Sequence, residues 1–76
     1  MTNMEVYKNA FVDLFGISEP ENLKYQEVPQ WDSVGHMELV ARLETDFQIM
    51  IDMDDVIDFS SFSKGIEIVK KYGVVI

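Results

Sequence analysis

Two residues that could do chemistry, Asp32 and Ser33, stand where an irregular stretch gives way to an amphipathic one. Their side-chain oxygens are of the kind that caps a helix N-terminus, because they accept hydrogen bonds from otherwise unpaired backbone N–H groups. We predict that Ser33 lies at or just inside the start of a helix with its hydroxyl exposed. A helix N-terminus offers free N–H groups and the positive end of the helix dipole, which suit a phosphodiester. The inward positions of this helix recur at i, i+3, i+4, i+7 and i+11, namely His36, Leu39, Val40, Leu43 and Phe47.

The tripeptide Asp32-Ser33-Val34 resembles the Asp-Ser-Leu signature of acyl carrier proteins, in which the serine bears 4′-phosphopantetheine. The resemblance implies that a phosphopantetheinyl transferase moves this arm from coenzyme A to Ser33 Oγ. The thiol of the arm then holds an acyl or aminoacyl group as a thioester. The chain would supply no catalytic group, so it is not expected to be an enzyme. The resemblance extends along the whole chain and includes Glu38, Leu39, Val40, Leu43, Glu44, Phe47, Ile51, Asp54, Asp55 and Phe59.

By the same resemblance, the helix after Ser33 is the surface that partner enzymes recognise. The implied partners are ligases that load the acyl or aminoacyl group, and downstream transferases or synthases with basic docking patches. Two residues depart from the family pattern: Arg42 is basic, and Gly35 stands where family members often carry an acidic residue. The residues expected to contact partners are Val34, Met37, Glu38, Ala41, Glu44, Asp54 and Asp55.

A cleft beside Ser33 that shields the cargo is a further expectation, although the same residues would serve equally well as ordinary core. His36 also lies one helical turn beyond Ser33 and could act as its base. We disfavour that role, because no third group is evident to orient the imidazole. The residues expected to border the cleft are His36, Leu39, Val56, Ile57 and Phe59.

These residues must be positioned by helices. We predict a single acyl-carrier-type domain over residues 1–76, an all-α antiparallel four-helix bundle with a short third helix and a long first loop. We expect Leu23 and Trp31 to anchor the loop. We expect a first helix over about residues 3–15, with a Thr2–Glu5 capping box at its start and Gly16 as its stop. After the loop 17–31, we expect a helix over about residues 33–47 and a short helix over residues 53–57 that the Asp52 carboxylate caps. Ser60 or Ser61 should cap the last helix, whose inward residues are Phe62, Gly65, Ile66 and Val69.

Composition excludes several classes of function. Fourteen acidic residues against six basic ones give a net charge of −8, which repels nucleic acids and anionic membranes. The acidic cluster Asp52–Asp58 fails the spacing of a calcium loop, because Val56 and Ile57 occupy positions that need an oxygen ligand and a glycine, so no metal site is expected. Cysteine is absent. We expect no membrane insertion, a cytoplasmic location and a monomer.

Two other functions remain open from the sequence. The chain could be a pantetheine-free acidic helical protein-interaction module, in which Ser33 acts only as an N-cap and Ser33→Ala costs about 1 kcal/mol of stability. A small serine-dependent enzyme is disfavoured, because the chain has one histidine and no nucleophile elbow.

Overall fold

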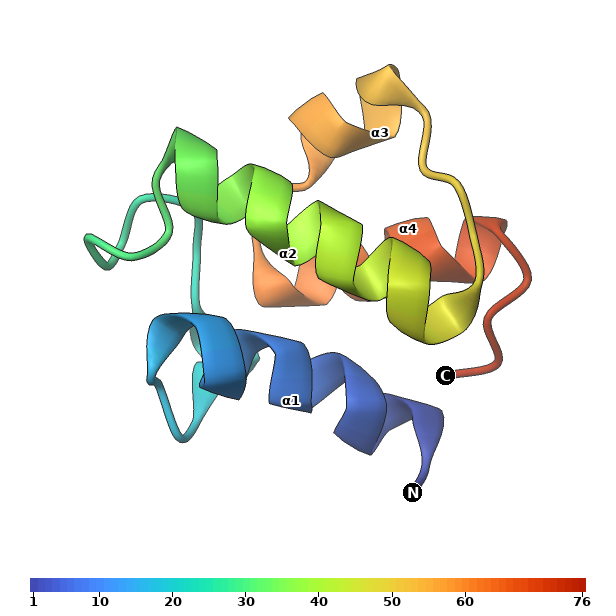
Figure 1. Ribbon diagram of the computed structural model, residues 1–76, viewed down its shortest axis with the longest axis horizontal. Helices are drawn as coiled ribbons and strands as arrows, with labels where there is room; N and C mark the ends of the chain where they lie inside the picture. Colours follow the sequence, from blue (N-terminus) through green and yellow to red (C-terminus); the bar gives the residue numbers. More distant parts are fainter.

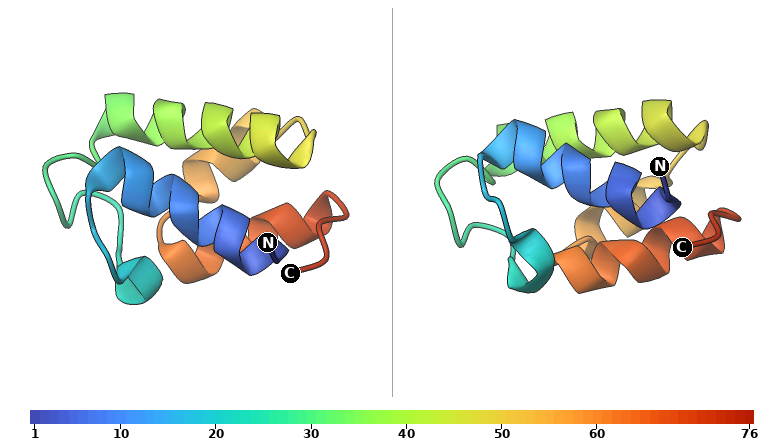
Figure 2. Two further views of the ribbon diagram at one scale, coloured as in Figure 1. Left: turned by 60° about the horizontal axis from the view of Figure 1, so that its bottom comes forward. Right: turned by 90° about the horizontal axis from the view of Figure 1, so that it is seen from below.

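The computed structural model describes residues 1–76 and contains four α-helices and no β-strand. The expected all-α class is therefore confirmed. Helices α1 and α2 lie side by side and run in opposite directions, and α1 and α3 lie on opposite sides of α2 and α4 (Figures 1 and 2). The helices are α1 (Asn3–Phe15), α2 (Ser33–Phe47), α3 (Met53–Asp58) and α4 (Phe62–Lys71), with a 3₁₀ turn at Pro20–Asn22.

Helix α1 begins and ends where the sequence predicts. The Thr2 hydroxyl accepts a hydrogen bond from the Glu5 N–H at 3.1 Å, and the Glu5 carboxylate accepts one from the Thr2 N–H at 2.9 Å. Gly16 ends the helix in the left-handed conformation (φ 68°), where a residue without a Cβ is favoured. The capping box and the glycine stop are both confirmed.

The N-terminus of α4 has a side-chain cap, and that of α3 has none. Ser61 caps α4 as predicted, because its hydroxyl accepts a hydrogen bond from the Lys64 N–H at 3.0 Å. The predicted capping of α3 by the Asp52 carboxylate is wrong, since this side chain makes no capping hydrogen bond. Instead the Asp52 backbone N–H donates to the Tyr72 hydroxyl at 2.9 Å. The start of α3 is therefore held by Tyr72, the residue that follows α4, rather than by a side-chain cap of its own.

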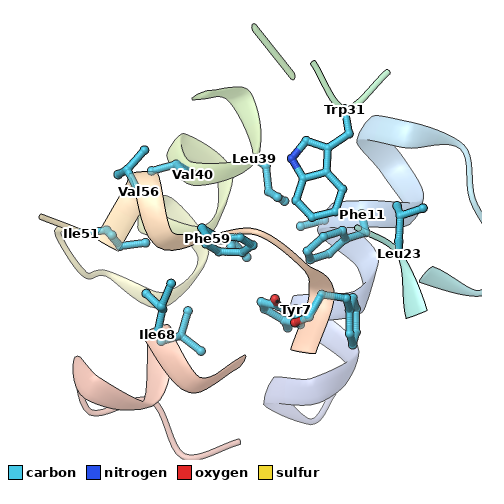
Figure 3. Close-up of a cluster of buried hydrophobic side chains, with 14 of the residues drawn as sticks. Tyr7, Phe11, Leu23, Trp31, Leu39, Val40, Ile51, Val56, Phe59 and Ile68 are labelled. Atoms are coloured by element: carbon cyan, nitrogen blue, oxygen red, sulfur yellow. Dashed lines mark hydrogen bonds between the residues drawn. The ribbon is translucent and has the colours of Figure 1, made fainter. Parts of the chain in front are cut away.

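Aromatic side chains fill the centre of the core. Trp31 is wholly buried, with its ring stacked on Phe15 (centroids 5.4 Å apart) and edge-on to Phe11 (5.5 Å). Figure 3 shows Phe59 between this ring cluster and the aliphatic side chains of α3 and α4. Leu23 is also buried, so both predicted loop anchors are confirmed.

Helix α4 approaches the rest of the chain closely at Gly65. A Cβ at this position would collide with the Phe59 ring and the Tyr7 hydroxyl. That hydroxyl donates to the Phe62 carbonyl oxygen at 2.7 Å, and its burial raises the pKa of Tyr7. The predicted inward face of α4 is correct except at Ile66, which is half-buried, whereas Ile68 is buried.

The loop before α2 is fixed by pairing with the segment that precedes α4. The Tyr25 N–H donates to the Ser60 carbonyl at 2.9 Å, and the Phe62 N–H donates to the Leu23 carbonyl at 2.9 Å. This pairing brings Tyr25 beside the start of α2, where the candidate site lies.

None of the four helices combines the length and the apolar character needed to cross a membrane.

Candidate functional site

Ser33 is the first residue of α2, and its side chain is exposed. The helix is capped one residue earlier, because the Asp32 carboxylate accepts a hydrogen bond from the Gly35 N–H at 2.8 Å. The Ser33 hydroxyl takes no part in capping, and no side-chain hydrogen bond of the chain involves it. The predicted position of Ser33 is confirmed, and the idea that Ser33 serves as the N-cap is wrong.

Gly35 allows the loop to fold tightly against the first turn of α2. A Cβ here would collide with the Gln30 carbonyl oxygen and would lie 3.3 Å from the Phe15 ring. A side chain larger than that of glycine would therefore not fit at this position without moving the loop.

A cleft of about 340 Å³ opens beside Ser33, between the start of α2 and α3. Four of the five residues predicted to border it do so, and the fifth, Leu39, does not. Leu39 is wholly buried, and Figure 3 shows its side chain directed toward Trp31 and Phe11 in the core. The cleft is lined by Tyr25, Ser33, His36, Met37, Met53, Val56, Ile57, Phe59 and Ser60.

Two polar residues of the cleft, Tyr25 and Ser60, were not foreseen from the sequence. They come together through the backbone hydrogen bond between them, which joins two irregular segments far apart in the chain. Such pairing has no local periodicity. The only signal was the aromatic residue Tyr25 in the loop, and its presence does not indicate where its ring packs.

His36 is buried at the inner end of the cleft, and both of its ring nitrogens are engaged. The Trp31 indole N–H donates to His36 Nδ1 at 2.9 Å, so Nδ1 must be the unprotonated nitrogen. Nε2 then carries the proton and donates to the Val56 carbonyl oxygen at 2.7 Å. The imidazole is therefore neutral and has no free lone pair with which to take a proton from Ser33. Its role in this structure is to join the loop, α2 and α3.

Five of the seven predicted partner-contact residues are exposed. Val34 and Met37 carry the apolar part of this surface, with 65% and 50% of their area exposed. Glu44 differs, since its carboxylate accepts a hydrogen bond from the Ile51 N–H at 2.9 Å and holds the turn after α2. The exposed five are Val34, Met37, Glu38, Ala41 and Asp54.

The structure corrects the expectation that Asp55, the seventh of these residues, contacts partners. Asp55 is only 8% exposed, and its carboxylate accepts hydrogen bonds from Lys71 Nζ at 2.7 Å and from the Tyr72 hydroxyl at 2.5 Å. The hydrogen bond from Lys71, followed by that from Tyr72, holds the pKa of Asp55 below its ordinary value of 3.8. Asp55 thus ties α3 to the end of α4 and is not free to contact a partner.

The stabilisation that Asp55 provides is expected to disappear in acid. Because its pKa is lower in the folded chain than in the unfolded one, the carboxylate stabilises the fold above pH 3.8, and the contribution is lost as the pH falls through the folded pKa. Asp55→Asn removes the contribution at every pH. Denaturant unfolding of both proteins from neutral pH downward should show the wild type more stable near neutrality, with the difference shrinking below about pH 4. A difference that stayed constant over this range would rule out the assignment.

Arg42, the basic residue of α2, is paired within the chain. Its guanidinium group contacts the carboxylates of Asp13 on α1 (3.1 Å) and Asp46 on α2 (2.8 Å). Its positive charge is therefore neutralised locally, and the exposed part of α2 near Ser33 keeps its acidic character through Glu38.

Comparison of the chain with protein-family models, curated proteins and solved structures gives no significant match. The site consists of an exposed primary hydroxyl at a helix start, a mostly apolar cleft beside it, and an imidazole whose ring nitrogens both make hydrogen bonds. In such a site the imidazole cannot take a proton from the hydroxyl without giving up one of its own hydrogen bonds.

Proposed function

We propose that the chain is a carrier protein that holds acyl or aminoacyl groups as thioesters on a 4′-phosphopantetheine arm attached to Ser33. The observation that carries the proposal is the position of Ser33. It is exposed on the first turn of α2, and its hydroxyl does not cap the helix because Asp32 does. A serine with no structural task at a helix start is available for modification. The resemblance of Asp32-Ser33-Val34 to the acyl-carrier signature supplies the identity of the group.

Attachment of the arm would require an external transferase. The Ser33 oxygen forms a bond to the phosphorus of coenzyme A next to the pantetheine, the bond to the adenosine bisphosphate breaks, and the serine proton goes to a base on the transferase. The new phosphodiester would lie at the N-terminus of α2, where unpaired N–H groups and the helix dipole favour negative charge. The chain contributes the acceptor and its electrostatic setting.

The surface around Ser33 suits partners with an apolar contact flanked by Arg or Lys. Val34 and Met37 are apolar and exposed on α2; the exposed acidic residues are Glu38 on the same helix and Asp54 on α3. Charge complementarity of this kind speeds encounter and selects partners. We infer that transferases, loading ligases and downstream synthases dock here, and that the four helices adopt the antiparallel bundle of a carrier domain, which acts as a monomer with one free arm.

The proposal is tested by incubating the protein with coenzyme A, magnesium and a broad-specificity phosphopantetheinyl transferase. The intact mass of the wild type should increase by one phosphopantetheine, and that of Ser33→Ala should not. Since Ser33 does not cap α2, this substitution should change the free energy of unfolding by less than about 0.5 kcal/mol. A folded wild type that several transferases leave unmodified would favour the pantetheine-free interaction module instead.

A further inference from the structure

The cleft beside Ser33 ends at a wall of rings. The His36 imidazole packs edge-on against Tyr25 (centroids 5.1 Å apart) and against Phe59 (5.6 Å). Behind it, Trp31 stacks on the imidazole and is wholly buried. None of the hollows in the molecule is lined by Trp31, Leu39 or Phe11, so the cleft does not continue into the core.

His36 is fixed in this wall by two hydrogen bonds. It receives one from Trp31 in the loop and donates the other to the Val56 carbonyl of α3, at 2.9 and 2.7 Å. The second bond spans the space between α2 and α3 at the inner end of the cleft. Moving the ring aside would break both bonds and leave the buried Trp31 N–H without an acceptor, which is costly. We therefore expect the His36 ring to stay in place and keep the inner end of the cleft closed.

We propose that His36 sets an upper limit on the size of the cargo, so that the carrier shelters short acyl or aminoacyl groups and leaves longer chains in solvent. If a methylene takes about the volume of a liquid water molecule, roughly 30 Å³, a cleft of about 340 Å³ holds roughly ten carbon atoms. The lining is mostly apolar, with Met37 and Met53 at the mouth able to adjust to different shapes. This inference rests on the proposed function, because the arm attached to Ser33 is what brings the cargo to the mouth of the cleft.

The limit can be measured without any transferase. The chain has no cysteine, so Ser33→Cys introduces a unique thiol on the edge of the cleft. Alkyl methanethiosulfonates of two to sixteen carbons attach straight chains there as disulfides. In the Ser33→Cys protein that keeps His36, the midpoint of thermal unfolding should rise by roughly 3–6 °C per buried methylene and stop rising at roughly ten carbons.

Two variants of the Ser33→Cys protein identify the residue responsible. His36→Ala should move the plateau to chains longer by roughly two or more carbons, since the space of the imidazole becomes available. Met37→Ala, which widens the mouth of the cleft, should leave the plateau where it was. A midpoint that keeps rising to sixteen carbons with His36 intact, no rise at any length, or an unchanged plateau in His36→Ala would each overturn the proposal. The first two outcomes remain decisive if His36→Ala does not fold. Failure of transferase loading in the separate mass experiment would instead count against the carrier function itself.

Discussion

Replacing Trp31 by alanine is expected to lower the free energy of unfolding by about 3–5 kcal/mol. The indole is wholly buried and contacts the rings of Phe11, Phe15 and His36. Its removal leaves a large cavity and deprives His36 Nδ1 of its donor. A chain of this size has a stability of about 4–11 kcal/mol, so the loss is a large part of the total. Thermal unfolding followed by circular dichroism should show the midpoint lowered by roughly 15–30 °C.

The matched control is Trp31→Phe. It keeps an aromatic ring in the core but removes the N–H group, so the His36 acceptor loses its partner and the cost should be about 1–3 kcal/mol. If Trp31→Ala lost less than about 1 kcal/mol, Trp31 could not be the anchor that holds the loop against α2.

Replacing Gly65 by alanine is expected to destabilise the protein by about 2–3 kcal/mol, although alanine favours helix more than glycine does. The added Cβ would overlap the Phe59 ring and the Tyr7 hydroxyl, both of which are buried. Relief requires α4 to move away from α1 or the Tyr7–Phe62 hydrogen bond to break. The urea concentration at the midpoint of unfolding should therefore fall, with an unchanged slope.

Glu67→Ala is the control for Gly65→Ala, because Glu67 is on the same helix and is exposed. Its effect should stay within about 0.5 kcal/mol. Equal stability of Gly65→Ala and wild type would mean that α4 does not pack as closely as the structure has it.

Most of the local structure could be predicted from the sequence. The bounds of α1 and α2 follow from caps and apolar spacing, which involve residues within a few positions of each other. The buried anchors Leu23 and Trp31 could be found because they are among the few apolar residues of an otherwise irregular stretch. Of the four cleft residues predicted correctly, His36 lies on α2, Val56 and Ile57 lie on α3, and Phe59 directly follows α3.

The errors have a common cause in contacts between distant residues. Asp55 reads as an exposed acidic residue until Lys71 and Tyr72 come against it from α4. Asp52 reads as a cap, but its N–H group is satisfied by Tyr72 and its carboxylate is not used. Leu39, about one helical turn after His36, was expected to line the cleft but does not. Residue spacing alone does not show that the His36 side chain closes the cleft before Leu39. Each of these depends on how α3 docks, and α3 is only six residues long.

We propose that Ser33, and no other hydroxyl of the site, accepts phosphopantetheine. Ser60 offers a matched control, since it is also an exposed serine and lines the same cleft. The measurement is fragment-ion mass spectrometry of wild type, Ser33→Ala and Ser60→Ala after the transferase reaction with coenzyme A. We predict one added phosphopantetheine on Ser33 in the wild type and in Ser60→Ala, and none in Ser33→Ala. Modification of Ser33→Ala, or a wild type that stays unmodified while folded, would contradict the account.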